Sequence, residues 1–361
     1  MVTGKGLAGV IRTHYSKPVL YFAVSLLIIT NTINIGADLG AMASSAQMLL
    51  GLPYIFWLFL MTGTIIALEV FVTYKTYSKV LKYLAMSLVA YVVTALIVKP
   101  DWGIIANNTL IPHIATSKEY IFSVVAILGT TISPYLFFWQ ASQEVEEEIA
   151  DGEIADVGVG KPTVTKNEVS SMDYDTMVGM FFSQAIMFFI IVTTAATLHA
   201  NGITNIDSAS QAAEALKPVA GNLAYLLFAV GIIGTGLLAV PVLAGSSAYA
   251  VSDTIGLKEG LSKKSGLAPG FYLVIAVSTL VGMIINWLGI DPIKALYYSA
   301  ALNGLSAPPL MILVLLTANN KKIMGKFVNK RISNILGWII VVVMTIAGIL
   351  LIIDLFSGLL Q

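Results

Sequence analysis

Long apolar segments recur along this 361-residue sequence, and each is bounded by charged residues, proline or glycine. A helix needs about 20 apolar residues to cross the hydrocarbon core of a bilayer. Hydrophobic residues make up 57% of the chain and charged residues 11%, whereas soluble domains carry about 25% charged residues. The sequence therefore excludes a water-soluble globule and predicts an all-α, polytopic membrane protein that lies in a lipid bilayer.

The lengths of the apolar segments predict nine membrane-spanning helices. We expect them at residues 18–50, 53–74, 77–98, 120–142, 177–198, 222–251, 269–288, 294–318 and 334–356. The expected organisation is an N-terminal segment, 1–17, followed by a single transmembrane domain, 18–356, which includes an acidic loop at 143–176.

Lysine and arginine are divided unequally between the two sides that these spans define. Sixteen of the 20 fall on the side of the N-terminus, and the other side holds only Lys99, Lys118, Lys217 and Lys294. Basic residues accumulate in cytoplasmic loops. The sequence thus predicts a protein of the cell membrane with a cytoplasmic N-terminus, a cytoplasmic acidic loop and an external C-terminus.

Several functional classes lack their sequence requirements. The chain has no cysteine, which excludes disulfides and thiolate metal sites, and its net charge of zero gives no bulk attraction to nucleic acid. The three histidines are scattered, and no phosphate-binding loop, dinucleotide fingerprint or hydrolase motif occurs. We therefore predict no enzyme activity, no nucleic-acid partner and no organic cofactor.

The segment GTTISPYLFFWQASQEVEEE, residues 129–148, places polar residues and a proline inside an apolar run. Pro134 has no N–H and obstructs the preceding turn, so the carbonyl groups near Thr130 and Thr131 lose their helical partners. Neighbouring groups, water or a bound cation must satisfy them, and transporters use such unwound segments as binding sites. We expect a broken helix at 129–136; a plain kink whose carbonyl groups are met by hydroxyl groups is the alternative.

Two acidic residues lie within the predicted spans. Asp38, in NTINIGADLGAMASSAQ, lines an ion or proton route, or forms a hydrogen-bonded packing seam between helices. Glu69 is expected to pair with Lys75 or to reach the membrane interface. Asn303, the polar residue in ALNGLSAPPLMILVLL, forms either a packing contact or part of a cavity wall.

Four segments resemble the NRAMP family of divalent-metal transporters, and in particular a bacterial branch that departs from the central metal motif. They are VTGKGLAGVIRTHYSKP, GADLGAMASSAQMLLGLP, ILGTTISPYLFFWQASQEVEEE and ALNGLSAPPLMILVLLTANNKKIMG. The resemblance implies two inverted five-helix repeats, with the first and sixth helices broken around a midplane metal site. Under this alignment the span at 18–50 corresponds to the family's third helix, so the first two helices, with their DPGN-type metal motif, are expected to be absent.

The resemblance also implies roles for individual residues. Ser133-Pro134-Tyr135 stands where members that carry transition metals have Met-Pro-His. Thr130 would contribute a carbonyl group and Ser133 a hard oxygen in place of soft sulfur, which relaxes selectivity for manganese or iron over magnesium. Tyr135 would be a gate without an imidazole, and Asn303 a cavity residue. Asp38 matches an acidic position on the proton route, whose second acidic position is Ala41 here.

The main hypothesis is therefore transport of a divalent cation such as Mn²⁺, Fe²⁺ or Mg²⁺ by alternating access, coupled to protons. A shortened, non-transporting relative of these proteins is the first alternative. A symporter of organic solutes with the same inverted-repeat architecture is the second.

Overall fold

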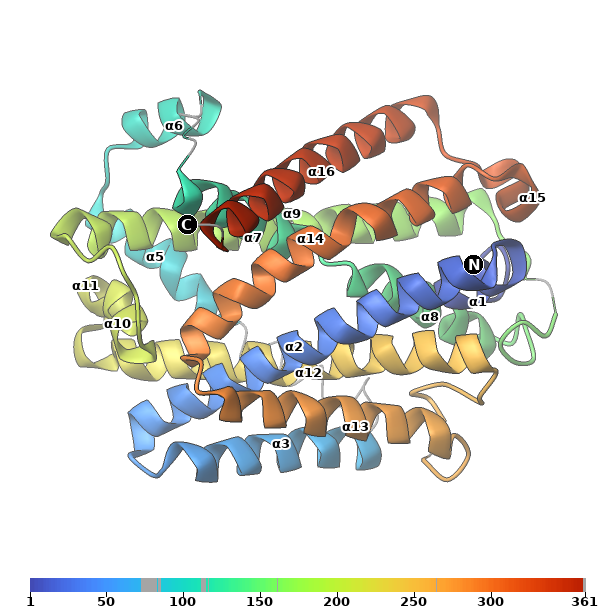
Figure 1. Ribbon diagram of the computed structural model, residues 1–361, viewed down its shortest axis with the longest axis horizontal. Coiled ribbons are helices and arrows are strands. Elements are labelled where there is room, and N and C mark those ends of the chain that lie inside the picture. Colours follow the sequence, from blue (N-terminus) through green and yellow to red (C-terminus); the bar gives the residue numbers. More distant parts are fainter. Residues whose placement is uncertain are drawn as a thin grey trace.

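The computed structural model describes residues 1–72, 83, 86–111, 115, 117–160, 162–263 and 265–359. These residues form helices joined by loops, which confirms the all-α prediction. The long helices run side by side, and the two chain ends lie at opposite ends of the bundle (Figure 1).

Within the described residues, eight helical segments are long and apolar enough to cross a membrane, and they correspond to eight of the nine predicted spans. They are α2 (Lys17–Leu50), α3 (Tyr54–Phe71), α7 (Lys118–Thr131) continued by α8 (Tyr135–Ala150), α9 (Lys166–Thr197), α12 (Ala224–Ile255), α13 (Pro269–Ile285) continued by η5 (Asn286–Leu288), α14 (Pro292–Ala318) and α16 (Arg331–Leu359). Shorter elements connect them: α1 (Leu7–His14), η2 (His199–Asn201), α10 (Ala209–Ala213), η3 (Glu214–Leu216), α11 (Lys217–Ala220), η4 (Gly221–Leu223), α15 (Lys321–Met324) and η6 (Gly325–Phe327).

The predicted span at 77–98 corresponds in its described part to the first half of a bent pair of helices, which would be a ninth span if the pair counts as one. Its first residues lie outside the described part of the chain, and its remainder forms η1 (Met86–Leu88) and α5 (Val89–Val98). A further helix, α6 (Trp102–Leu110), follows at a bend of 118° and was not predicted. The Asp101 side chain caps α6 by accepting hydrogen bonds from the Gly103 and Ile104 amides, so a new helix starts directly after the bend.

The acidic loop predicted at 143–176 is shorter in the structure. Helix α8 continues to Ala150, and α9 begins at Lys166, where Thr165 and Glu168 form a reciprocal capping box. Charged helical turns at both ends were assigned to the loop because they lack the apolar pattern of a span. The connection between the helices is therefore residues 151–165.

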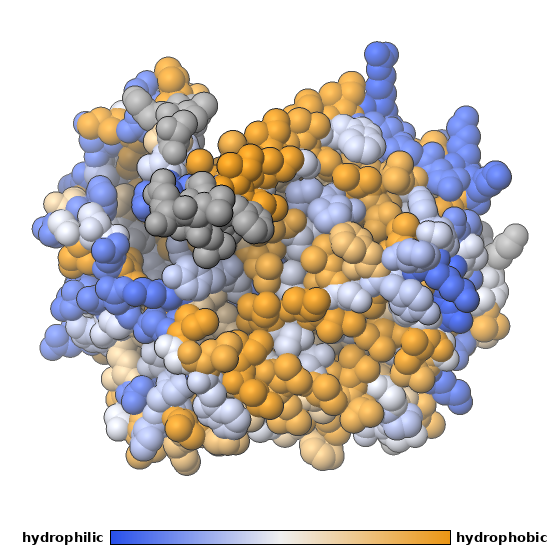
Figure 2. Space-filling view, viewed as in Figure 1, coloured by the Kyte–Doolittle hydropathy of each residue, from blue (hydrophilic) through white to orange (hydrophobic). Residues whose placement is uncertain are grey.

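Helix α2 lies at the centre of the bundle and packs against α3, α12, α13 and α14. Apolar residues spread across the middle of the face in Figure 2, between hydrophilic residues at its two ends. On α16, Ile339, Ile346 and Ile353 are exposed and recur at heptad spacing along one side. Such a side suits contact with lipid and agrees with a membrane-spanning bundle.

Helices α7 and α14 approach each other closely at two glycines. A Cβ atom at Gly129 would collide with the carbonyl oxygen of Ala300 and the amide nitrogen of Gly304. A Cβ atom at Gly304 would lie 2.7 Å from Cγ1 of Val125. Small residues of this kind let helix backbones pack together in membranes, so this crossing fixes the position of α7 just before the helix break.

The crossing generates a stability prediction. Gly129→Ala should destabilise the protein by about 1–3 kcal/mol, because backbone atoms, which cannot rotate away, must shift to admit the methyl group. The matched control is Gly63→Ala in α3, where a Cβ atom has no heavy atom within 4 Å. That control should be neutral or stabilising by up to about 1 kcal/mol, since alanine favours a helix. Thermal unfolding in detergent measures both; equal shifts at the two glycines would contradict the assigned contact.

Candidate functional site

The predicted broken helix is confirmed, and the break is narrower than 129–136. Helix α7 ends at Thr131 and α8 begins at Tyr135, so the interruption comprises Ile132, Ser133 and Pro134. The Ile132 amide still bonds to the Leu128 carbonyl oxygen (2.9 Å), and the next backbone bond joins the Leu136 amide to the Ser133 carbonyl oxygen (3.1 Å). Because Pro134 has no N–H, the Thr130 carbonyl has no helical partner.

The Ser133 hydroxyl lies against the carbonyl groups left over at the break. Its Oγ is 3.3 Å from the Gly129 carbonyl oxygen and 3.3 Å from that of Thr130, and the residue is only 6% exposed. One hydroxyl has one proton, so it donates fully to only one of the two carbonyl groups at a time. The alternative of a plain kink whose carbonyl groups are met by hydroxyl groups therefore describes the break only in part. The Ser133 hydroxyl and the carbonyl groups of Gly129 and Thr130 form a group of three oxygen atoms.

Tyr135 links this group to Asp38 of the central helix. The Tyr135 side chain interacts with that of Ser133 and lies within range of the Asp38 charge. It also packs against two separate apolar clusters of the core. Three of the five predicted site residues, Ser133, Tyr135 and Asp38, are therefore brought together.

Asn303 reaches the same region through a neighbour on α2. The Asn34 side-chain amide donates to Oδ1 of Asn303 (2.7 Å), and the Asn303 amide donates back to Oδ1 of Asn34 (3.3 Å), with both residues buried. Asn34 lies one helical turn before Asp38 on α2. Asn303 thus makes an interhelical contact next to the predicted site.

Thr130 can offer only its backbone. Its side chain is exposed on the outer side of α7, where the hydroxyl donates to the Ile127 carbonyl oxygen (2.8 Å). The role predicted for Thr130 concerns its carbonyl group and not this hydroxyl.

One alternative expected Glu69 to reach the membrane interface. The structure contradicts it, because Glu69 is buried on α3 and only 4% exposed. Helix α3 packs against α2 and α13. Lys75, its other expected partner, lies outside the described residues.

Sequence reasoning identified the polar residues of α2 and missed the partners through which they hold α2 against its neighbours. The Asn31 amide donates to the Leu243 carbonyl oxygen (3.0 Å) and to the hydroxyl groups of Ser246 (2.8 Å) and Ser247 (2.9 Å) on α12. Asn31, Asn34 and Asp38 follow at helical spacing and share one side of α2. That spacing was the available signal, and it identified a polar helix without naming its partners.

The donor set at the break consists of oxygen atoms. Over the part of the chain that the structure describes, no group of three or more His, Asp or Glu side chains converges on one point. The candidate site therefore offers a hydroxyl, backbone carbonyl groups and the nearby Asp38 carboxylate, which are hard ligands suited to ions such as Mg²⁺ and Mn²⁺.

A bundle of long apolar helices, with one helix broken at a proline and polar side chains buried beside the break, is the architecture of a secondary membrane transporter. The chain matches the model of the Nramp family, described as natural resistance-associated macrophage protein-like, over residues 1–354. It belongs to that family.

Individual relatives agree with this assignment. The chain is 25% identical to the divalent metal cation transporter MntH of Klebsiella pneumoniae (strain 342), over 95% of this chain and 78% of that protein. It is 28% identical to MntH of Caldanaerobacter subterraneus subsp. tengcongensis, over 88% of this chain and 74% of that protein.

Solved structures of the Eremococcus coleocola manganese transporter share the fold. A crystal structure of one mutant gives a TM-score of 0.72 at 15% identity, covering 98% of this chain and 75% of that one. The same transporter in complex with an aromatic bis-isothiourea substituted compound gives 0.72, covering 95% and 73%. The predicted fold class, the inverted-repeat fold of this transporter family, is thereby confirmed.

The asparagine pair generates a prediction about packing next to the site. Asn34→Ala or Asn303→Ala alone leaves a buried amide without its partner, which should cost about 1–3 kcal/mol. The double variant should lose less than the sum of the two single losses, because neither amide then remains to be satisfied. Thermal unfolding of the four proteins in detergent gives the coupling energy. Strictly additive losses would show that the two side chains do not interact.

Proposed function

We propose that this chain moves divalent metal cations across the cell membrane by alternating access, in a cycle coupled to protons. The observation that carries the proposal is the family match over residues 1–354, together with relatives named as divalent metal cation transporters that align with 95% of the chain. The proposed orientation places the N-terminus in the cytoplasm and the C-terminus outside, as the distribution of lysine and arginine favours.

The helix break supplies the proposed cation contacts. The Thr130 carbonyl and the Ser133 hydroxyl lie 3.3 Å apart and already face each other. If the hydroxyl proton turns away, the lone pairs of both oxygens can point at an ion. The Asp38 charge near Tyr135 adds an attraction that is stronger in a buried site than in water.

Tyr135 and Asn303 are proposed to line the route to these contacts. Tyr135 is the first residue of α8, directly after the break, so a change in the angle between α7 and α8 would move its ring. The backbone hydrogen bonds described above stop on one side of Ser133 and resume on the other. The segment can bend there with little loss of helical hydrogen bonding, which is what an alternating-access element requires.

The Ser133 side chain provides the test of metal contact. Ser133→Met introduces a soft thioether, so we expect uptake of Mg²⁺ relative to Mn²⁺ to fall about tenfold, equivalent to about 1.4 kcal/mol. Uptake into proteoliposomes of the purified chain is the measurement. Ser123→Ala is the control, because it changes a serine of α7 that lies away from the break. The Ser123 hydroxyl contacts Tyr297 (2.6 Å).

Each alternative predicts a different result in the same assay. A wild-type chain that takes up no Mn²⁺, Fe²⁺ or Mg²⁺ above empty liposomes would support the non-transporting alternative. Uptake of an organic solute without metal would support the symporter alternative. If Ser133→Met takes up metal normally and its ion preference is unchanged, Ser133 is not a cation contact.

Asp38 provides the test of proton coupling. An inward proton gradient should accelerate metal uptake by the wild type, whereas Asp38→Asn should show the same rate with and without the gradient, because the amide cannot release a proton. Asp101→Asn is the matched control, since asparagine caps α6 as well as aspartate does. A gradient response that survives in Asp38→Asn would contradict the role proposed for Asp38.

A further inference from the structure

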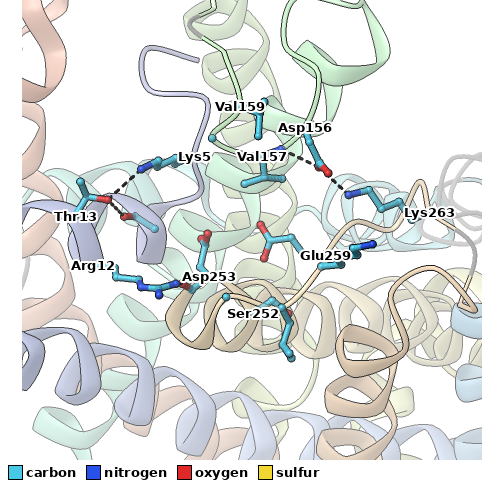
Figure 3. A pocket seen from close by; sticks show the side chains of 15 residues that line it. Lys5, Arg12, Thr13, Asp156, Val157, Val159, Ser252, Asp253, Glu259 and Lys263 are labelled. Carbon is cyan, nitrogen blue, oxygen red and sulfur yellow. Dashed lines mark hydrogen bonds and ion pairs between the residues drawn. The ribbon is translucent and has the colours of Figure 1, made fainter.

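A second polar region lies at the end of the bundle that carries the N-terminus. It is a cavity of about 450 Å³ between α1, the 151–165 connection, the end of α12 and the loop from α12 to α13. Figure 3 shows its side chains, among them Lys5, Arg12, Asp156, Asp253 and Glu259. None of these residues belongs to the helix break.

Two carboxyl groups in this cavity each have a buried oxygen atom without a hydrogen-bond partner among the described residues. Glu259 is 5% exposed, and its Oε2 is buried with no hydrogen-bond partner among the described residues. Asp253, at the end of α12, is half-buried, and its Oδ2 is likewise a buried atom with no hydrogen-bond partner among the described residues. Figure 3 shows both carboxyl groups pointing into the space below Val157, side by side. They therefore share one poorly solvated space.

Among the described residues, the basic side chains of the cavity form their hydrogen bonds and ion pairs with groups other than the carboxyl groups of Asp253 and Glu259. Arg12 donates to the backbone carbonyl oxygen of Asp253 (2.9 Å), and Lys5 donates to the Thr13 hydroxyl (3.2 Å). Lys263 forms an ion pair with Asp156 (2.8 Å). Two adjacent carboxylates with buried oxygen atoms and no directly bound cation cannot both ionise at low cost, and a single proton relieves the repulsion.

We propose that Asp253 and Glu259 form a proton-binding site in this cavity, where the pair holds one proton at neutral pH and Glu259 carries it. This inference does not depend on the metal transport proposed above. It assigns a proton site to the membrane-edge loops, separate from the helix break.

The surroundings of Glu259 favour its neutral form. Burial raises the pKa of Glu259 to about 9, and the charges of Asp253, Glu146 and Asp156 act in the same direction, while Lys263 opposes them. The hydrogen bond from Lys263 lowers the pKa of Asp156, so Asp156 stays ionised.

Asp253 has the more favourable environment for a negative charge. From α1 and the residues before it, Arg12 and Lys5 act on the Asp253 carboxylate, and the Gly9 amide bonds to it. Lys258 also lines the cavity. The proton is thus assigned to Glu259 and the charge to Asp253.

The protonation state of Glu259 is linked to helix α8 through the loop that contains it. The Glu146 carboxylate on α8 accepts hydrogen bonds from the amides of Leu261 (2.6 Å) and Ser262 (3.0 Å), and from the Tyr249 hydroxyl. Loss of the Glu259 proton would place a new negative charge close to Glu146 and Asp253. The repulsion would weaken the attachment of this loop to α8.

The test is the pH dependence of stability for the full chain in detergent. A carboxyl group whose pKa is raised on folding stabilises the protein below its unfolded pKa, and this contribution is lost as pH rises through about 9. Glu259→Gln keeps the neutral form at every pH. We therefore expect the melting temperature of Glu259→Gln to exceed that of the wild type by several degrees more at about pH 10 than at about pH 6.

Two further variants complete the experiment. Glu153→Gln changes an exposed glutamate of the 151–165 connection and should keep the wild-type pH dependence. Asp253→Asn removes the neighbouring charge that raises the Glu259 pKa, so the loss of stability should become smaller and end at a lower pH than in the wild type. Infrared spectroscopy near pH 8 should show a protonated carboxyl band that is lost in Glu259→Gln.

Two results would overturn the proposal. One is parallel pH curves for wild type and Glu259→Gln, with the carboxyl band retained. The other is stabilisation of the wild type near pH 9 by Mg²⁺ or Mn²⁺ alone that is lost in Glu259→Gln, which would make the pair a metal site.

Discussion

The absence of water inside a bilayer is the constraint on which this structure depends. Every backbone N–H and carbonyl group there needs a partner within the protein. Helices meet this requirement along most of the chain. A residue that breaks a helix leaves backbone carbonyl groups without partners, and nearby groups must then bond to them. Pro134 breaks a helix in this way, and the Ser133 hydroxyl lies within hydrogen-bonding distance of the carbonyl groups of Gly129 and Thr130. The chemistry proposed for the chain thus begins as an unmet hydrogen-bonding requirement.

Helix α2 meets the same constraint with side chains. Asn31 bonds to α12 and Asn34 to α14, so polar contacts orient the central helix toward both neighbours. Together with Asp38, the two asparagines form a polar stripe along one side of an otherwise apolar helix. Contacts of this kind are individually modest in membranes, and here they fix the rotation of α2 and hence the direction in which Asp38 faces.

The features that depend on local sequence could be predicted, and those that depend on distant partners could not. Apolar length located eight spans, and Pro134 located the break, because both effects act within a few residues. Helix α6 was missed because it is short, and the charged ends of α8 and α9 lack an apolar pattern. The partner of Asn303 and the meeting of Asp253 with Glu259 follow from tertiary packing, which no single segment encodes.

The close approach of Gly129 to Gly304 has a mechanical consequence. It ties α7 to α14 by backbone contact, and both of these helices also pack against α16. On the other side of the break, Glu146 ties α8 to α12 and its following loop. The three residues between α7 and α8 therefore join two helices that are each held by their neighbours. Leu128 of α7 and Phe137 of α8 also pack against the same apolar cluster of α14 and α16. A bend at the break would therefore require that cluster to repack.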